Sequence, residues 1–351
     1  MSLVRGFGSD NHAEVHPDIF NSMLQANQGH AHSYGFDENT EAVEKKIKDL
    51  FGLSHSNNLA STSSYFVYNG TAANILALKA CLESFNSVIC SDIAHINVDE
   101  CGGPEVYGGF KLIPVKSKNG KISLEDIKAQ FVRKGDQHFS QVKVISLTQP
   151  TELGTCYSLK EIKEICDWAH QNKLYVHVDG ARFANACVYL KSSFSEMTTH
   201  LGVDVISFGG TKNGLLAGEI VIFINPHLGN NFKYFRKQFG QLPSKSRFIA
   251  AQFQAYFDNN LWHQIASHSL KMAKYLEEKL SNFSEIKIIY PVESNSVFVL
   301  FPKIHIKELK NSKFFYIWDE LTFSARLMLS WDSKPSDVDE FIEKMNSLGI
   351  K

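Results

Sequence analysis

The stretch Val203-Asp204-Val205-Ile206-Ser207-Phe208-Gly209-Gly210-Thr211-Lys212-Asn213-Gly214 joins an apolar segment to a glycine-flanked turn. We predict that residues 203–207 form a buried strand and that Lys212 stands on the loop after it. Burial lowers the pKa of an amine, and small neighbouring residues leave room for a flat ligand. Lys212 is therefore a candidate for an imine with an aldehyde, although a glycine–lysine turn taken alone is more often an ordinary exposed loop.

A second predicted strand ends in the acid that complements this lysine. The apolar segment Tyr175-Val176-His177-Val178 runs into Asp179-Gly180-Ala181-Arg182. Pyridoxal phosphate (PLP) requires such a pair, because its aldehyde binds a lysine and a carboxylate keeps its pyridine nitrogen protonated, so that the ring accepts electrons. Asp179 and Lys212 together therefore favour a PLP site over an ordinary turn.

The rest of the chain repeats the alternation of strand and helix. Helical patterns such as 72–80 and 159–171 separate apolar segments that we predict to be strands, at 65–68, 87–91, 112–115, 142–147, 175–178, 203–207 and 220–224. This order predicts an α/β fold with a mostly parallel central sheet, covered on both sides and with ligands at the carboxyl ends of its strands. Polar residues follow five of these strands: Asn69-Gly70-Thr71, His95, Thr148-Gln149, Asp179 and Lys212.

The turn Asn69-Gly70-Thr71 opens an alanine-rich helix that includes Ala72. The free N–H groups and the positive end of the dipole at such a helix start suit a phosphate. The same turn also fits an ordinary strand-to-helix connection that Thr71 caps. Both interpretations stay open on this stretch alone.

The pattern changes near residue 235. Helices at 248–258 and 261–280 precede short strands at 286–290, 297–300 and 325–329 and a last helix from Ser336. We predict an N-terminal arm at 1–20, a large PLP-binding domain at 21–235 and a smaller α+β domain at 236–351.

Composition excludes several classes of function. The 351 residues are 44% hydrophobic and 21% charged, and 36 Lys and Arg balance 37 Asp and Glu, so we expect no nucleic-acid partner. We expect no membrane association and no secretory signal. The six cysteines lack a C-x-x-C spacing, which favours reduced thiols and a cytoplasmic protein. His30-x-His32 has no third ligand at a suitable spacing, so we predict no metal site.

Two of the quoted stretches carry a family resemblance. His177-Val178-Asp179-Gly180-Ala181-Arg182 and Ser207–Gly214 resemble the threonine aldolases, and Tyr34-Gly35 and Ala325-Arg326-Leu327 support the likeness. These are PLP-dependent enzymes of the aspartate aminotransferase fold, called fold type I. The second stretch is similar to the low-specificity and phenylserine aldolase branch.

The resemblance implies a role for each matching residue. Lys212 forms the imine with the cofactor, Asp179 pairs with the pyridine nitrogen, and His95 stacks on the ring. The other implied contacts are Gly70, Thr71 and Ala72 to the phosphate; Ser9, Arg182 and Arg326 to the substrate carboxylate; and, across a subunit boundary, Arg247 to a neighbouring phosphate and Tyr34 to the partner's pocket. The expected assembly is a homodimer or homotetramer with shared active sites.

Three of these residues also fit purely structural roles. Arg182 is typical of a salt-bridge partner, Arg326 of a cation that neutralises a buried acid, and His95 of a hydrogen-bonded core histidine.

The chain departs from its relatives in the loop after residues 142–147. Many family members carry a Glu-Asn-Thr-His type of stretch there, whereas this chain has Leu147-Thr148-Gln149-Pro150-Thr151-Glu152. Because no histidine stands in this loop, the expected catalytic base is His95, a phosphate oxygen or a bound water.

The expected reaction is cleavage of L-threonine and related β-hydroxy-α-amino acids to glycine and an aldehyde. Another fold type I enzyme, a β-eliminating lyase or an aminotransferase, shares the same lysine and aspartate. A non-catalytic PLP protein is a third interpretation. A nicotinamide dehydrogenase is disfavoured because no G-x-G-x-x-G follows the first strand.

Overall fold

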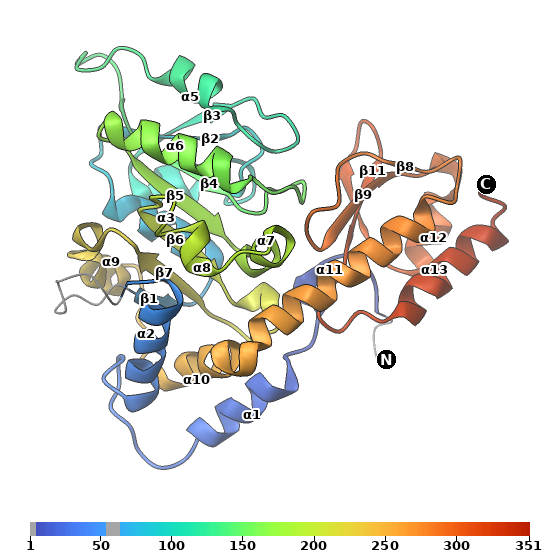
Figure 1. Cartoon of the computed structure of the whole chain (residues 1–351), viewed down its shortest axis with the longest axis horizontal. Helices are drawn as coiled ribbons and strands as arrows, with labels where there is room; N and C mark the ends of the chain where they lie inside the picture. Colours follow the sequence, from blue (N-terminus) through green and yellow to red (C-terminus); the bar gives the residue numbers. More distant parts are fainter. Residues whose placement is uncertain (1–4, 54–63) are drawn as a thin grey trace.

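The computed structural model describes residues 5–53 and 64–351, so residues 1–4 of the expected arm lie outside it. A seven-stranded sheet forms the larger body (Figure 1). In spatial order its strands are β1 (Ser64–Val67), β7 (Glu219–Phe223), β6 (Val205–Gly209), β5 (Tyr175–Gly180), β4 (Gln141–Thr148), β2 (Asn86–Ser91) and β3 (Lys111–Val115). Neighbours from β6 to β3 pair in parallel, and β7 runs antiparallel to β6 and β1.

Alternate residues of these strands face two separate apolar layers. In β7, Ile220 and Ile222 enter one layer, whereas Val221 and Phe223 enter the other. The first layer packs against most helices of this body: α2 (Glu38–Leu50), α5 (Leu124–Gln130), α6 (Leu159–Gln171), α7 (Phe183–Leu190), α8 (Phe194–Met197) and α10 (Arg247–Phe257). The opposite layer lies under α3 (Gly70–Ala80), α4 (His95–Val98) and α9 (Phe232–Gln238). The sheet is therefore covered on both sides, as the alternating pattern predicts.

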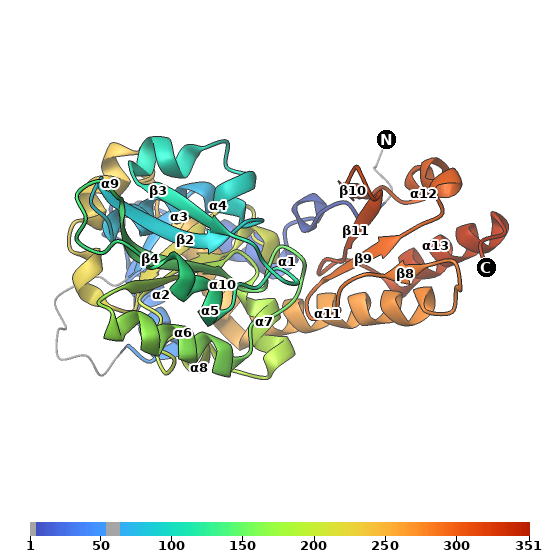
Figure 2. The same cartoon turned by 90° about the horizontal axis from the view of Figure 1, so that it is seen from above.

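A second, four-stranded sheet lies at the other end of the molecule (Figures 1 and 2). Its strands are β10 (Tyr316–Asp319), β11 (Ser324–Met328), β9 (Ser296–Leu300) and β8 (Lys287–Ile288). The helices around it are α11 (Leu261–Leu280), α12 (Ile306–Ser312) and α13 (Pro335–Ser347), while α1 (Pro17–Ala26) packs on α10.

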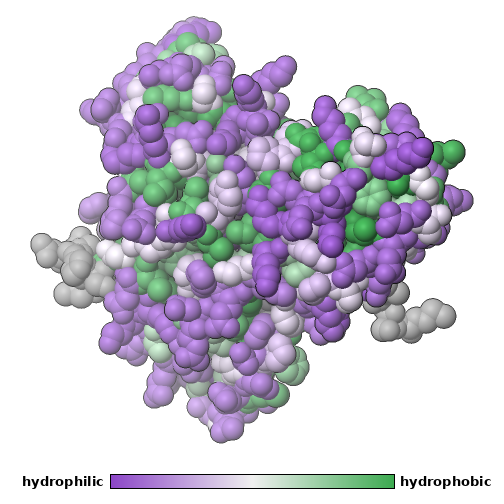
Figure 3. Space-filling model, turned by 45° about the vertical axis from the view of Figure 1, so that its right-hand side comes forward, coloured by the Kyte–Doolittle hydropathy of each residue, from purple (hydrophilic) through white to green (hydrophobic). Residues whose placement is uncertain are grey.

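The long helix α11 connects the two bodies. Its first turns bury Trp262 and Ile265 in the core of the large sheet, and its later turns bury Met272 and Leu276 beneath the small sheet. Figure 3 shows a face on which hydrophilic side chains predominate and hydrophobic ones lie in scattered groups. Among the described helices, none combines the length and the apolar character that a membrane span requires.

The prediction of a mostly parallel sheet with a smaller second sheet is confirmed. The pattern missed β10 and α12, and the expected strand at 286–290 is only the two-residue β8. All six cysteines are unpaired, and only Cys101 among them is exposed.

Candidate active site

Asp179 and Lys212 lie at the same edge of the central sheet. Asp179 is the penultimate residue of β5, and Lys212 follows β6 in the short 3-10 helix η3 (Thr211–Asn213). These strands are parallel neighbours, with Asp179 opposite Ser207 in the register. Both residues therefore stand at carboxyl ends, where α/β sheets bind ligands.

A buried acid fixes the loop that carries the lysine. Oε2 of Glu219, which starts β7 opposite Gly209, accepts the Gly210 N–H at 2.6 Å. A Cβ at Gly210 would stand 2.6 Å from the Gly218 carbonyl oxygen, so no larger residue fits this position. Burial raises the pKa of Glu219 to about 7. The loop is thus tied to the sheet on the side next to the lysine.

The surroundings of Lys212 favour its neutral amine. The positive charge of Arg182 and then burial lower the pKa of Lys212, while Asp10, Asp179 and Glu219 oppose this shift. A larger fraction of neutral amine is what imine formation needs.

The Asp179 carboxyl group is buried and oriented by two donors. Asn74 donates Nδ2 to Oδ2 at 2.8 Å, and the Ala181 N–H donates to Oδ1 at 3.1 Å. Asn74 comes from α3, so the helix after the first strand helps to aim the acid at the end of β5.

Arg182 is already engaged within the chain. Its Nε and Nη2 donate to the two oxygens of Asp10 at 2.5 and 2.8 Å, and Asn295 donates to the same carboxylate at 3.2 Å. Burial acts to raise the pKa of Asp10, but Arg182 and Lys212 hold it below its ordinary value. The arginine therefore forms the salt bridge that its sequence also suggested, and this bridge ties the arm to β5.

Arg326, by contrast, has unused donors. Its guanidinium lies 5.1 Å from the centre of the Trp318 ring, and its Nε is buried without a hydrogen-bond partner among the described residues. Burial and then the charge of Arg182 lower the pKa of Arg326. The small sheet thus presents a cation near Arg182 that pairs with no described acid.

His95 opens α4 just beyond β2 and contacts two acids. Oε1 of Glu152 accepts its backbone N–H at 2.9 Å and the Thr148 hydroxyl at 2.8 Å. Oε1 of Glu100 lies 2.8 Å from its Nδ1. Burial raises the pKa of Glu152 to about 7. The ring of His95 is partly exposed at the edge of the central sheet that holds Asp179, so His95 is not a buried core histidine.

The start of α3 offers free backbone donors. Neither Gly70 nor Thr71 donates its N–H to a described residue, and a Cβ at Gly70 would meet nothing within 4 Å. The Ala72 N–H, however, already bonds to the side chain of Asn69, the N-cap residue, at 2.9 Å. Asn69 rather than Thr71 therefore caps the helix, and an anion would meet Gly70 and Thr71 first.

Three of the predicted residues have other contacts in this chain. Ser9 caps the short helix η1 (Asp10–His12), next to the acid that holds Arg182. Tyr34 is largely exposed, with its N–H bonded to Ser244, and Arg247 bonds to the Gly29 carbonyl oxygen at 3.2 Å.

Arg247 lines a surface pocket together with His30 and His32. No group of three or more His, Cys, Asp or Glu side chains in residues 5–53 and 64–351 is arranged to hold a metal ion.

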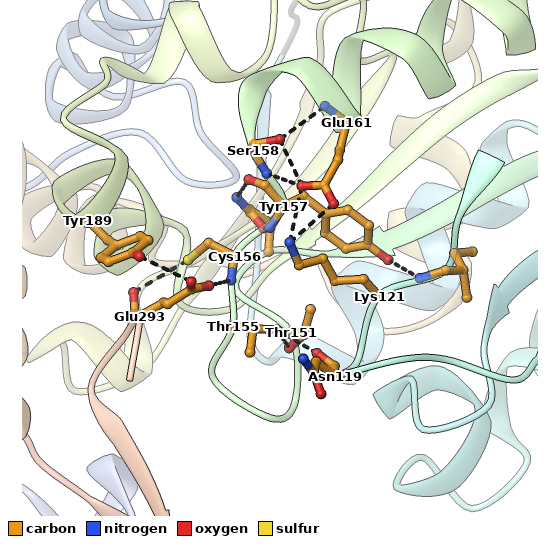
Figure 4. Close-up of polar contacts among 12 residues, drawn as sticks. Asn119, Lys121, Thr151, Thr155, Cys156, Tyr157, Ser158, Glu161, Tyr189 and Glu293 are labelled. Atoms are coloured by element: carbon orange, nitrogen blue, oxygen red, sulfur yellow. Dashed lines mark hydrogen bonds and ion pairs between the residues drawn. The ribbon is translucent and has the colours of Figure 1, made fainter. Parts of the chain in front are cut away.

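Residues 149–157, the β4 loop, carry Glu152 and are held on several sides (Figure 4). Glu293, just before β9, accepts the Cys156 N–H at 2.7 Å and the Tyr189 hydroxyl at 3.1 Å. On the other side Thr155 donates to the Asn119 carbonyl oxygen at 2.6 Å. The segment between β8 and β9 therefore helps to fix the loop in which many family members carry a histidine.

Comparisons with known proteins identify the family of the chain. The model of the beta-eliminating lyase family matches residues 6–303. A low specificity L-threonine aldolase from Pseudomonas aeruginosa is 38% identical, and one from another Pseudomonas strain is 36% identical. Each alignment covers 95% of this chain and 95% of the relative. The chain belongs to the threonine aldolases of the beta-eliminating lyase family. The solved structure of Leishmania major threonine aldolase is 26% identical, with a TM-score of 0.91 over 98% of this chain and 99% of that one.

The structure of this threonine aldolase family member adds five residues that the sequence did not single out for the site. They are Asp10, Asn74, Glu100 and Glu152, which each bond to a predicted site residue, and Glu219, which bonds to Gly210 on the loop of Lys212. Asp10 adjoins the predicted Ser9, and Glu152 ends the quoted stretch Leu147–Glu152, but the sequence pattern assigned neither of them a role.

Proposed function

We propose that this protein cleaves L-threonine and related β-hydroxy-α-amino acids to glycine and an aldehyde, with pyridoxal phosphate as cofactor. One observation carries the proposal: a buried carboxyl group and a lysine of lowered pKa lie at one edge of the central sheet, and the small sheet brings an arginine with an unpaired Nε close to Arg182. The membership of the chain among threonine aldolases agrees with it.

The residues at this edge fit the cofactor. When bound, pyridoxal phosphate supplies an aldehyde for an amine and a protonated ring that accepts electrons from Cα. Lys212 provides the amine, and the oriented carboxyl group of Asp179 suits the ring nitrogen. Gly70 and Thr71, whose N–H groups are unpaired among the described residues, would hold the phosphate together with Ala72, and His95 would lie against the ring.

The two arginines divide the work of binding the substrate carboxylate. Arg182 keeps its two bonds to Asp10 and turns its remaining N–H donors to the substrate, whereas Arg326 offers N–H donors that are unpaired among the described residues. Ser9 lies beside Asp10 and adds a hydroxyl. This grip fixes rotation at Cα, so that the Cα–Cβ bond is the one that breaks.

A panel of amino acids tests the reaction. With L-threonine or L-phenylserine we expect equal amounts of glycine and the matching aldehyde. Ammonia with a keto acid would instead identify a β-eliminating lyase, and transfer of the amino group an aminotransferase. Both threo and erythro substrates belong in the panel, because the site residues do not distinguish them.

We further propose a homodimer or homotetramer in which Arg247 and Tyr34 serve the partner's site. Their contacts lie around residues 28–37, away from Lys212. Co-refolded Lys212→Ala and Arg247→Ala subunits test this arrangement. Activity should return in the hybrid, because one site then regains both wild-type residues. No recovery would place Arg247 in the site of its own chain.

The six unpaired cysteines support a cytoplasmic location for this enzyme, since thiols stay reduced there. Fractionation of cells with an antibody to the protein tests the proposal.

A further inference from the structure

The His95 ring and the Glu100 carboxyl group form a pair whose members differ in exposure. The His95 side chain is 36% exposed, whereas the Glu100 side chain is 0% exposed and lies 2.8 Å away through Oε1 and Nδ1. Glu100 follows α4 by two residues, so the short helix places both groups. The acid is thus shielded by the histidine that it contacts.

This contact selects one tautomer of the ring. Burial raises the pKa of Glu100, whereas its hydrogen bonds with His95 and Asn74 act to lower it. In its charged form this carboxylate only accepts hydrogen bonds, so Nδ1 of His95 then carries the proton that points at Glu100. Nε2 makes no hydrogen bond to a described residue. In the neutral ring Nε2 is therefore the nitrogen with the free lone pair, and it is available on the exposed side.

Asn74 links this pair to the acid of the cofactor site. Its Nδ2 lies 3.0 Å from Oε1 of Glu100 and 2.8 Å from Oδ2 of Asp179. Two acidic acceptors require the amide nitrogen in this position, because the amide oxygen cannot donate. The hydrogen bonds thus run from the ring through Glu100 and Asn74 to Asp179.

Two oxygen atoms of this hydrogen-bond network lack a partner among the described residues, whereas a pair that serves only stability has its oxygens occupied. Glu100 Oε2 and Asn74 Oδ1 are both buried without a hydrogen-bond partner among the described residues. A buried oxygen without a hydrogen-bond partner destabilises the folded state, so packing alone gives no reason for a carboxyl group here.

We propose that Glu100 is a positioning residue, which fixes the Nδ1–H tautomer of His95 so that Nε2 takes the proton from the β-hydroxyl group of the substrate. The proposal rests on the proposed aldol cleavage. As the O–H and Cα–Cβ bonds break, the aldehyde C=O bond forms and the electron pair of the Cα–Cβ bond stays with Cα. The proton on Nε2 is then available for Cα, so that protons and electrons balance.

The charged groups around His95 set the pH range in which its Nε2 can accept a proton. The hydrogen bond that His95 donates to Glu100 raises the pKa of His95; burial and Lys212 oppose this shift, and Asp179 supports it. Glu152, which belongs to the β4 loop, accepts the backbone N–H of His95. Below this pKa Nε2 carries a proton and accepts none, so the rate should fall on the acid side.

Glu100→Gln tests the role of the charge. Glutamine keeps the shape and an acceptor for Nδ1, but it removes the negative charge. We expect the acid limb of kcat to move down by about one pH unit, because a lost neighbouring charge shifts a pKa by that order. KM for threonine should change less than twofold. Glu100→Asp keeps the charge and should stay within half a unit of the wild type.

A second readout is independent of turnover. In cofactor-free protein with ¹⁵N-labelled histidine, the signals missing from His95→Asn identify the ring. Their titration should show Nδ1–H as the neutral form and should move to lower pH in Glu100→Gln. The matched control is Asp204→Asn, which removes a similar carboxylate from His170 and should leave the His95 titration unchanged.

An unchanged His95 titration and an unchanged pH profile in a folded Glu100→Gln protein would overturn the proposal. So would a neutral ring that carries its proton on Nε2. If the wild type releases no aldehyde while the ring titrates as expected, the proposed reaction fails and the tautomer assignment stands.

Discussion

The two ends of the central sheet each hold a histidine–carboxylate pair, but the pairs differ in their surroundings. At the amino end, Asp204 accepts from His170 at 2.9 Å, from the Val176 N–H at 2.9 Å and from Asn225 at 3.1 Å. At the carboxyl end, Oε2 of Glu100 has no partner among the described residues. The first pair connects α6, β5 and β6 and has every oxygen occupied.

The difference extends over the whole carboxyl edge. Buried atoms without a partner among the described residues include those of Asn74, Glu100 and Glu152 at this edge and of Asn295 and Arg326 in the small-sheet body, although others, such as Ser87 Oγ in β2, lie elsewhere. Such groups cost stability when they are left unpaired, and they are found at sites that complete their bonds with a ligand. The His170–Asp204 pair therefore serves stability, whereas the carboxyl edge keeps groups that a ligand can use.

Removal of the lysine at the carboxyl end should have the largest effect on activity. Lys212→Ala should lose the visible absorbance of the cofactor-bound enzyme and reduce kcat by about 10³-fold or more. Lys143 at the amino end, which bonds to the Lys173 carbonyl oxygen, gives the matched control. Lys143→Ala should keep both the spectrum and the rate. A Lys212→Ala protein with normal absorbance would contradict the assignment.

Asp179→Asn should have the next largest effect. The amide keeps the size of the side chain but removes the charge that stabilises a protonated ring nitrogen, so we expect kcat to fall by about 10²- to 10³-fold while the cofactor still binds. Absorbance and kcat measured on the same sample separate the two effects. A normal rate in the variant would exclude the role of this acid.

Arg326→Gln should act on binding more than on turnover. Because this arginine pairs with no carboxylate among the described residues, its loss should raise KM for threonine by about 10- to 100-fold, the worth of a hydrogen bond to a charged group. Thermal stability should stay within about 1 kcal/mol of the wild type. If KM stays constant and stability falls, Arg326 has a structural role instead.

The smallest effect on activity should come from Asp204→Asn. The carboxylate bonds with His170 and Asn225 are lost or weakened, so the free energy of unfolding should fall by about 1–3 kcal/mol. Urea unfolding measures this loss, and kcat should stay unchanged. A change in kcat without a loss of stability would reverse the contrast between the two ends.

Periodicity predicted much of the fold because most elements bury one face against a sheet. The bounds of α6 and α11 agree with the pattern at 159–171 and 261–280. The strand β10 was missed because only Ile317 within Tyr316–Asp319 is aliphatic and an acid ends the run. The boundary at residue 235 stays a prediction, since α10 packs into the large core and α11 into both cores.

The site was predictable only where one local stretch carries it. Asp179 and Lys212 each end an apolar strand, so their meeting followed from the rule for parallel sheets. The partners of these residues come from far along the chain, as Asp10 does to Arg182 and Asn295 does to Asp10. Local patterns hold no information on such contacts.

The position of the imine tests the central claim most directly. The enzyme should be incubated with pyridoxal phosphate, reduced with borohydride, digested and analysed by mass spectrometry for the modified lysine. We predict that the label lies on the peptide containing Lys212, at one per chain. A label on another lysine, or none on a folded protein that binds the cofactor, would contradict the account.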